Sequence, residues 1–297
     1  FEGWAIYFPT QDLVDQFLVT DEETGKAMPW YETSQYKNNV TVLDPSSITE
    51  AGQVDAYKQV NGDARRIPTP QDLNQLNKSY PTFTRYHQLN KGADRDLSEL
   101  MYSGRDRRFY TAIVYDKCSW IGETVELNLG GNLSAGVRDK EDGGWYNTTT
   151  GYYWRKGNIE NPTPRAYHNC QVALHFNIVR LGEAYMNLAE AYLLKHDVPN
   201  AVKALNMTRT IHGGLSESTA ATEEEAWTDY IRERNCELTN EGGDIYYSYL
   251  RWGKYGGYAN HGRDAGDIIY DLDRPVYKMS ISRDRSKLLV GQMTLNN

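Results

Sequence analysis

Residues 171–214, QVALHFNIVRLGEAYMNLAEAYLLKHDVPNAVKALNMTRTIHGG, carry the strongest helical pattern in the chain. Apolar residues recur from Val172 to Tyr192 at steps of three and four. This period predicts an amphipathic helix that runs through the first part of the stretch. Arg180 and Glu183 are spaced for an ion pair on the surface of that helix.

A second helix follows the first after a tight connection. Asp197 is placed to cap it, Pro199 falls in its first turn, and Gly213–Gly214 are expected to end it. Two such helices with small alanines between them predict a hairpin of the tetratricopeptide type. One hairpin cannot bury its faces alone, and no others are evident upstream. We therefore expect that an N-terminal part of the protein is missing from this chain.

A third helix is predicted to begin at Thr222, where Thr222–Glu225 fits a capping box, and to stop at Gly242–Gly243. These three helices define a helical segment over residues 171–253. Residues 254–297 are expected to form an irregular tail that packs back on the core and contains a strand-like run, Val276–Ser282.

Residues 1–170 have little regular pattern and predict a loop-rich region. A short helix is expected at Pro9–Leu18, with Thr10 as its cap. Phe109–Tyr115 and Thr124–Leu129 alternate like the strands of small hairpins. The predicted fold class is thus mainly α, with helical hairpins and a loop-rich region that contains short β-hairpins.

The composition excludes several kinds of partner. The 297 residues carry a net charge of −8, and no long basic run is present, so a nucleic-acid partner is not expected. No apolar run approaches 18 residues, so no membrane-spanning helix is predicted. The 23 tyrosines and 7 tryptophans suit sugar faces and wet interfaces, although each ring could equally seal irregular packing.

No catalytic or metal-binding motif stands out. The six histidines form no HxxxH or HExxH pair, and no GxSxG, P-loop or GxGxxG sequence occurs. The three cysteines, Cys118, Cys170 and Cys236, are expected to be free thiols, with one disulfide possible. We predict no metal, no cofactor and no enzymatic activity, because nothing selects the two carboxylates that glycoside hydrolysis needs.

Several motifs together resemble the SusD/RagB family of nutrient-uptake lipoproteins from the Bacteroidetes outer membrane. Six elements occur in the family's order: Pro9–Asp15, Asp106–Ala112 continuing to Tyr115 and Trp120, Thr150–Lys156, Arg180–Ala191, Ala201–Arg209, and Ile231–Leu238 with Glu241–Gly242 and Leu250–Gly253. The chain departs from the family pattern at Arg107, where proline is usual, and after Gly253. The match covers the C-terminal, larger part of such a protein.

The resemblance implies a scaffold of tetratricopeptide hairpins that carries a loop-rich ligand-binding region. It implies capture of a glycan and delivery to a SusC-type TonB-dependent transporter, on the extracellular face of the outer membrane. It also implies a lipid anchor on the missing N-terminal part. Charged residues shared with the family are expected to form structural ion pairs: Arg180, Glu183, Glu190, Arg232, Glu233, Arg234, Glu237, Glu241 and Arg251, together with Trp252.

Ligand contacts are expected on loops that carry flat side chains, because sugar C–H faces stack on aromatic rings and sugar hydroxyls bond to amides. The predicted binding residues are Trp30, Tyr31, Tyr36, Asn38 and Asn39 on one loop, with Trp145 and Tyr146 on another. The alternative for both loops is that the rings anchor the loop by packing.

Two other functions stay open at this point. A peptide-capture protein of the RagB kind would have the same scaffold with fewer ring platforms. A glycoside hydrolase would release product from a polysaccharide. The many tyrosines and tryptophans favour the glycan.

Overall fold

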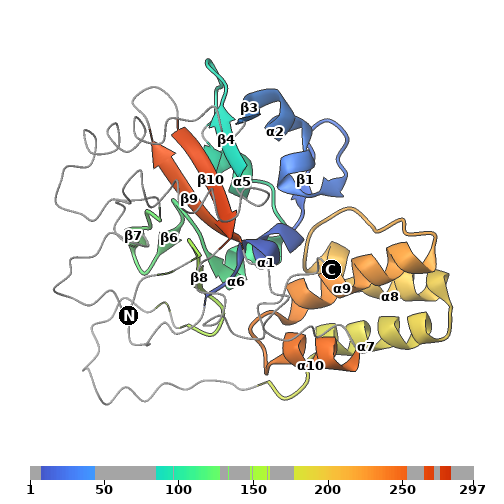
Figure 1. Ribbon diagram of the computed structural model, residues 1–297. Coiled ribbons are helices and arrows are strands. Elements are labelled where there is room, and N and C mark those ends of the chain that lie inside the picture. Colours follow the sequence, from blue (N-terminus) through green and yellow to red (C-terminus); the bar gives the residue numbers. More distant parts are fainter. Residues whose placement is uncertain are drawn as a thin grey trace, which may run out of the picture.

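The computed structural model describes residues 8–43, 85–95, 97–127, 133, 148, 150–158, 160, 177–252, 264–270 and 275–281. The fold is mainly α, as predicted. Figure 1 shows a group of long helices on one side of the molecule and a sheet with short elements on the other.

The described helices differ strongly in length. The long helices are α7 (Leu181–Leu194), α8 (Val198–Ile211) and α9 (Glu223–Leu238), followed by α10 (Asp244–Arg251). The short ones are α1 (Gln11–Gln16), η1 (Trp30–Glu32), α2 (Ser34–Asn39), α5 (Leu97–Tyr102) and α6 (Arg107–Ala112).

The strands form one four-stranded antiparallel sheet and three small pairs. The sheet has the order β3-β4-β10-β9, from Val40–Leu43, Arg85–Leu89, Pro275–Ile281 and Asp264–Tyr270. The pairs are β1–β2 (Val19–Thr20, Ala27–Met28), β5–β8 (Ile113–Val114, Tyr153–Trp154) and β6–β7 (Ser119–Trp120, Glu123–Thr124).

The predicted helix caps are confirmed. Thr10 Oγ1 accepts from the Leu13 N–H, Asp197 Oδ1 accepts from the Asn200 N–H, and Thr222 and Glu225 form the capping box. These caps satisfy N–H groups that the first turn of a helix leaves without a partner. Local sequence therefore fixes where α1, α8 and α9 begin.

The first long helix starts later than predicted. Residues 177–180 are not helical, and α7 begins at Leu181. Arg180 has an extended backbone, and its guanidinium bonds to Glu237 and Glu241 rather than to Glu183. The prediction of an Arg180–Glu183 pair was wrong, because partners from the end of α9 hold Arg180 outside the helix.

Two other predictions need correction. The prediction of a strand over Phe109–Tyr115 was wrong for most of its length, because Asp106 caps α6 and only Ile113–Val114 are extended. Of Thr124–Leu129, only Thr124 lies in a described strand, β7.

The C-terminal region is more regular than predicted. Helix α9 ends at Leu238, and Gly242 and Gly243 have positive φ in the turn that leads into α10, a helix that the sequence pattern did not reveal. Strand β10 confirms the strand-like run after Val276 and pairs with β4, while β9 was not expected. The domain boundaries at residues 170 and 253 remain predictions.

Short elements on the sheet side pack around α1, whose C-terminal end is held by Arg105. The Arg105 guanidinium donates to the backbone carbonyls of Val14, Phe17 and Met101, and lies 5.1 Å from the centroid of the Phe109 ring. Helix α1 in turn contacts α9, where Asn235 Nδ2 donates to Gln16 Oε1 at 2.7 Å. The two sides of the molecule therefore share a packed junction.

Candidate functional site

The segment predicted to bind ligand folds as η1 and α2 rather than as an open loop. Trp30 is 0% exposed, its Nε1 donates to Asp15 Oδ1 at 2.8 Å, and its ring packs edge-on against Tyr36, with centroids 5.0 Å apart. Tyr36 is buried as well. A ring without exposed surface offers no face to a sugar, so the expectation of a stacking platform at Trp30 and Tyr36 is corrected.

The outward side of the same segment is polar. Asn38 is exposed, whereas Asn39 and Tyr31 are half-buried. Asn38 Nδ2 donates to Glu23 Oε1 at 3.3 Å, and Asn39 Nδ2 donates to the Gln35 carbonyl. Ligand binding by Tyr31, Asn38 and Asn39 stays a prediction. Trp145 and Tyr146 lie outside the described residues.

Two further segments meet α2 at this surface. Asn90 Nδ2 donates to the Asn38 carbonyl, and Thr41 Oγ1 donates to Asn90 Oδ1 at 2.6 Å. Arg95 donates to Glu22 Oε1 at 2.5 Å. We call this polar surface the α2 rim, defined as Glu22, Glu23, Asn38, Thr41, Asn90 and Arg95.

Sequence reasoning missed most of the α2 rim. Glu22 and Arg95 are 73 residues apart, and Thr41 and Asn90 are 49 apart. Antiparallel pairing of β3 with β4 brings the latter two together, with Val40 opposite Leu89. No local pattern signals such a register.

The β1–β2 turn is fixed to α2 by one carboxylate. Asp21 Oδ1 accepts from the Ser34 N–H at 2.5 Å, and Asp21 Oδ2 accepts from the N–H and the hydroxyl of Thr24. These bonds, led by the one from Ser34, hold the pKa of Asp21 well below its usual range. The turn that carries Glu22 and Glu23 is therefore positioned before any ligand arrives.

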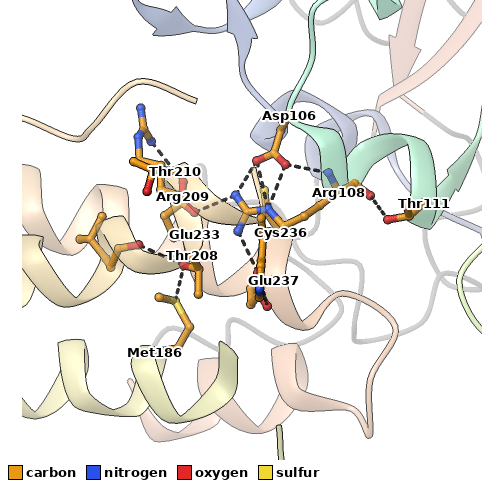
Figure 2. A network of polar contacts seen from close by, with 12 residues as sticks. Asp106, Arg108, Thr111, Met186, Thr208, Arg209, Thr210, Glu233, Cys236 and Glu237 are labelled. Carbon is orange, nitrogen blue, oxygen red and sulfur yellow. Dashed lines mark hydrogen bonds and ion pairs between the residues drawn. The ribbon is translucent and has the colours of Figure 1, made fainter. Parts of the chain in front are cut away.

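The densest group of charges in the described part of the chain lies elsewhere, in the junction between the two sides of the molecule. Figure 2 shows Arg108 reaching from α6 toward Glu233 and Glu237 on α9. Arg108 lies 2.5 Å from Asp106, 2.7 Å from Glu233 and 3.1 Å from Glu237. We call the group formed by Asp106, Arg108, Arg180, Arg209, Glu233 and Glu237 the junction network.

The junction network is balanced in charge. Arg209 donates to Glu233 at 3.1 Å, and Arg180 binds Glu237, so three guanidinium groups face three carboxylates. The carboxylate side chains are at most 2% exposed. Buried charges persist in this way only when they are paired and hydrogen-bonded.

Glu237, one of these carboxylates, is poorly suited to acid catalysis. Burial favours a raised pKa for Glu237, but the hydrogen bond from Arg180 and the charges of Arg108 and Arg180 outweigh it and lower that pKa. A glycosidase instead needs one carboxyl group whose pKa is raised so that it stays protonated. For Arg180, Glu233 and Glu237, the ion pairs expected of charges shared with the family are present.

A second network joins α7, α9 and α10. Glu190 accepts from Arg251, from the Tyr230 hydroxyl at 2.5 Å and from Trp252 Nε1 at 3.1 Å. Arg234 bonds to Asp244 at 2.5 Å. Burial alone would raise the pKa of Glu190. The hydrogen bonds from Arg251, Tyr230 and Trp252, among which the Arg251 bond has the largest effect, outweigh burial and lower that pKa. This network is likewise a set of structural contacts.

Cys118 and Cys236 are buried free thiols, as predicted, and Cys170 lies outside the described residues. Within the described ranges, no group of three or more His, Cys, Asp or Glu side chains is placed to hold a metal ion. In the same part of the chain, no helix has the length and apolar character required to cross a membrane.

Solved structures resemble this fold. A SusD-like protein from Bacteroides fragilis NCTC 9343 is 22% identical and superposes with a TM-score of 0.57 over 96% of this chain and 44% of that one. A SusD-like carbohydrate-binding protein from the same strain is 18% identical, with a TM-score of 0.44 over 65% of this chain and 37% of that one. This chain thus spans less than half the length of either protein. No curated protein matches it significantly.

The sequence pattern of the SusD family extends over nearly the whole chain, from residue 1 to residue 289. The structural match supports the same fold without relying on any single motif. The chain therefore belongs to the SusD family.

Proposed function

We propose that this protein captures a glycan at the bacterial cell surface and passes it to a SusC-type TonB-dependent transporter. The proposal rests on membership of the SusD family and on the α2 rim. In the rim, amide, hydroxyl and guanidinium groups from three segments lie on one surface. Such groups match the hydroxyls of a sugar, and we infer that the half-buried Tyr31 ring takes a C–H face.

The α2 rim suits a binding protein better than an enzyme. Its groups are exposed or half-exposed and are tied to one another by hydrogen bonds, as in Asn38–Glu23 and Thr41–Asn90. They can exchange these bonds for bonds to a ligand with little rearrangement. The second loop, Trp145 and Tyr146, is proposed to contribute stacking rings to the same ligand.

Calorimetric titration of the full-length protein against a panel of polysaccharides and peptides tests the proposal. We expect one polysaccharide class to bind, and Tyr31→Ala and Asn38→Ala each to weaken binding about tenfold, which corresponds to about 1.4 kcal/mol. Asn200→Ala, an exposed asparagine on α8, serves as the matched control and should leave binding unchanged.

Three results would change the assignment. Binding of peptides alone would favour a peptide-capture protein of the RagB kind. Product release during incubation with a polysaccharide would favour a hydrolase. If substitutions of Tyr31, Asn38, Trp145 and Tyr146 leave sugar binding unchanged, the proposed function stands and the binding site lies elsewhere in the protein.

The proposed location is the extracellular face of the outer membrane, through a lipid anchor outside these 297 residues. Protease added to intact cells should then degrade the protein, and a periplasmic marker should survive. Co-purification of a TonB-dependent transporter from detergent-solubilised membranes tests the proposed partner.

A further inference from the structure

Asp21 is a buried carboxylate at the start of the turn between β1 and β2. It is 2% exposed although it is charged. Its Oδ1 accepts from the Ser34 N–H, at the start of α2, and its Oδ2 accepts from the N–H and the hydroxyl of Thr24 at 2.8 and 2.6 Å. Hydrogen bonds to a charged group are about twice as strong as bonds between neutral groups. The burial of this charge is therefore offset by its donors, and the turn is tied to α2.

Gln35 makes a second link between the same two segments. Its side chain is 9% exposed, its Nε2 donates to the Thr20 carbonyl at 3.0 Å, and its Oε1 accepts from the Glu22 N–H at 3.1 Å. The backbone on both sides of Asp21 is thus held against the first turn of α2. We call this group the turn clamp, defined as Thr20, Asp21, Glu22, Thr24, Ser34 and Gln35.

Helix α2 does not need Asp21 in order to begin. Thr33 is its N-cap, and Thr33 Oγ1 accepts from the Tyr36 N–H at 3.3 Å. The buried rings of Trp30 and Tyr36 anchor the same segment in the core. The bonds of Asp21 to Ser34 and Thr24 therefore serve to place the turn rather than to form the helix.

The clamped turn carries two members of the α2 rim, Glu22 and Glu23. Glu22 accepts from Arg95, and Glu23 Oε1 accepts from Asn38 Nδ2 at 3.3 Å. Exposed contacts of this kind are too weak to fix a turn by themselves. The orientation of the Arg95 and Asn38 side chains therefore depends on where the buried turn clamp holds the two glutamates.

We propose that Asp21, supported by Gln35, is a positioning residue of the glycan site. It does not touch the ligand, and it raises affinity by holding the β1–β2 turn where the α2 rim needs it. This inference rests on the proposed function, because it concerns the same surface. A preformed rim binds more tightly than a mobile one, since the turn and its side chains lose less conformational freedom when the ligand arrives.

Amide hydrogen exchange of the full-length protein tests the positioning without a ligand. Asp21→Asn replaces one acceptor oxygen by an NH2 group that faces N–H donors. The Glu22 N–H bonds to Gln35 and not to Asp21, so faster exchange there reports the whole turn. We expect that rate to rise about tenfold, while the Met186 N–H in α7 keeps its rate. Faster exchange at Ser34 and Thr24 alone, or an equal rise at Met186, would overturn the proposal.

Calorimetric titration of the full-length protein with soluble starch, galactan, mannan and xylan tests the effect on affinity. For a polysaccharide that binds the parent, we expect Asp21→Asn and Gln35→Met each to raise Kd about tenfold. Arg108→Met is the control for lost stability, because Arg108 lies in the junction network, and it should leave Kd unchanged. An unchanged Kd for Asp21→Asn, or an equal loss of affinity for Arg108→Met, would overturn the proposal.

A double variant tests whether Asp21 acts through the rim. Asp21→Asn combined with Asn38→Ala should raise Kd less than the product of the two single effects, by about threefold or more, because part of the Asp21 effect passes through Asn38. Strictly multiplicative effects would refute this. If none of the four polysaccharides binds the parent, the proposed function fails for them, and the exchange rate of the Glu22 N–H still decides whether Asp21 positions the turn.

Discussion

Removing Arg108 should destabilise the protein strongly. The Arg108 side chain is 9% exposed and bonds to three carboxylates, Asp106, Glu233 and Glu237. Breaking a buried ion network by deleting one partner leaves charge uncompensated and typically costs about 3–5 kcal/mol. Arg108→Met keeps most of the volume and removes the charge.

In Arg108→Met, the three carboxylates keep other partners, so we expect the loss of unfolding free energy to lie near the lower end of that range. Glu233 keeps Arg209, and Glu237 keeps Arg180 and half-exposed His212. Asp106 keeps the backbone N–H that it caps. With each carboxylate partly compensated, we expect the free energy of unfolding to fall by about 3 kcal/mol.

Urea unfolding monitored by circular dichroism measures the loss. Arg95→Met is the control, because Arg95 pairs with Glu22 at the surface and should contribute less than about 1 kcal/mol. The double variant Arg108→Met/Glu233→Gln should be more stable than the sum of the single losses predicts, by about 1–3 kcal/mol. A loss below 1 kcal/mol for Arg108→Met, or strict additivity, would refute a coupled buried network.

Three further outcomes are expected from urea unfolding. Trp30→Ala should lower the free energy of unfolding by about 3–5 kcal/mol, because the ring is fully buried, whereas exposed Asn38→Ala should change it by less than about 0.5 kcal/mol. Gly182→Ala should lower it by about 1–3 kcal/mol, since the added methyl group overlaps the Glu237 carboxylate; no effect would mean that the carboxylate moves freely. The pKa values of Glu237 and Glu190 are lowered from 4.5 in the folded protein. The free energy of unfolding that these two carboxylates contribute is therefore present above about pH 4.5 and is lost as the pH falls through the lowered values. Unfolding midpoints that stay constant from pH 6 to pH 3 would contradict this.

The sequence predicted the features that depend on local chemistry. Thr10, Asp197 and Thr222 were found because a capping side chain bonds to N–H groups within three residues along the chain. The family motifs likewise predicted the helical scaffold. The helical character of α7 was correct, but its start was not, since Arg180 is held by Glu237, 57 residues away.

A missed local cap and several long-range partners explain the other errors. The alternation in Phe109–Tyr115 predicts a strand, yet Asp106 caps a helix there, and Glu233, 125 residues after Arg108, binds the Arg108 side chain of that helix. Trp30 was expected to offer its ring to a ligand because it falls in a predicted loop, but Asp15 and Tyr36 hold it inside. The α2 rim depends on strand register, for which a single sequence carries no signal.

The side chains that stabilise the fold and the side chains that are proposed to bind a ligand lie in different parts of the structure. Asp106 and Arg108 precede α7, whereas Arg209, Glu233 and Glu237 belong to the helical bundle, so the junction network fastens the sheet side to the helices. The α2 rim lies on the other side of η1 and α2, whose inner rings form part of the core around α1. Because Trp30 and Tyr36 anchor the segment from within, Asn38 and its neighbours can change without unfolding it. Substitutions in the α2 rim should therefore alter ligand affinity at nearly constant stability, whereas substitutions in the junction network should alter stability first.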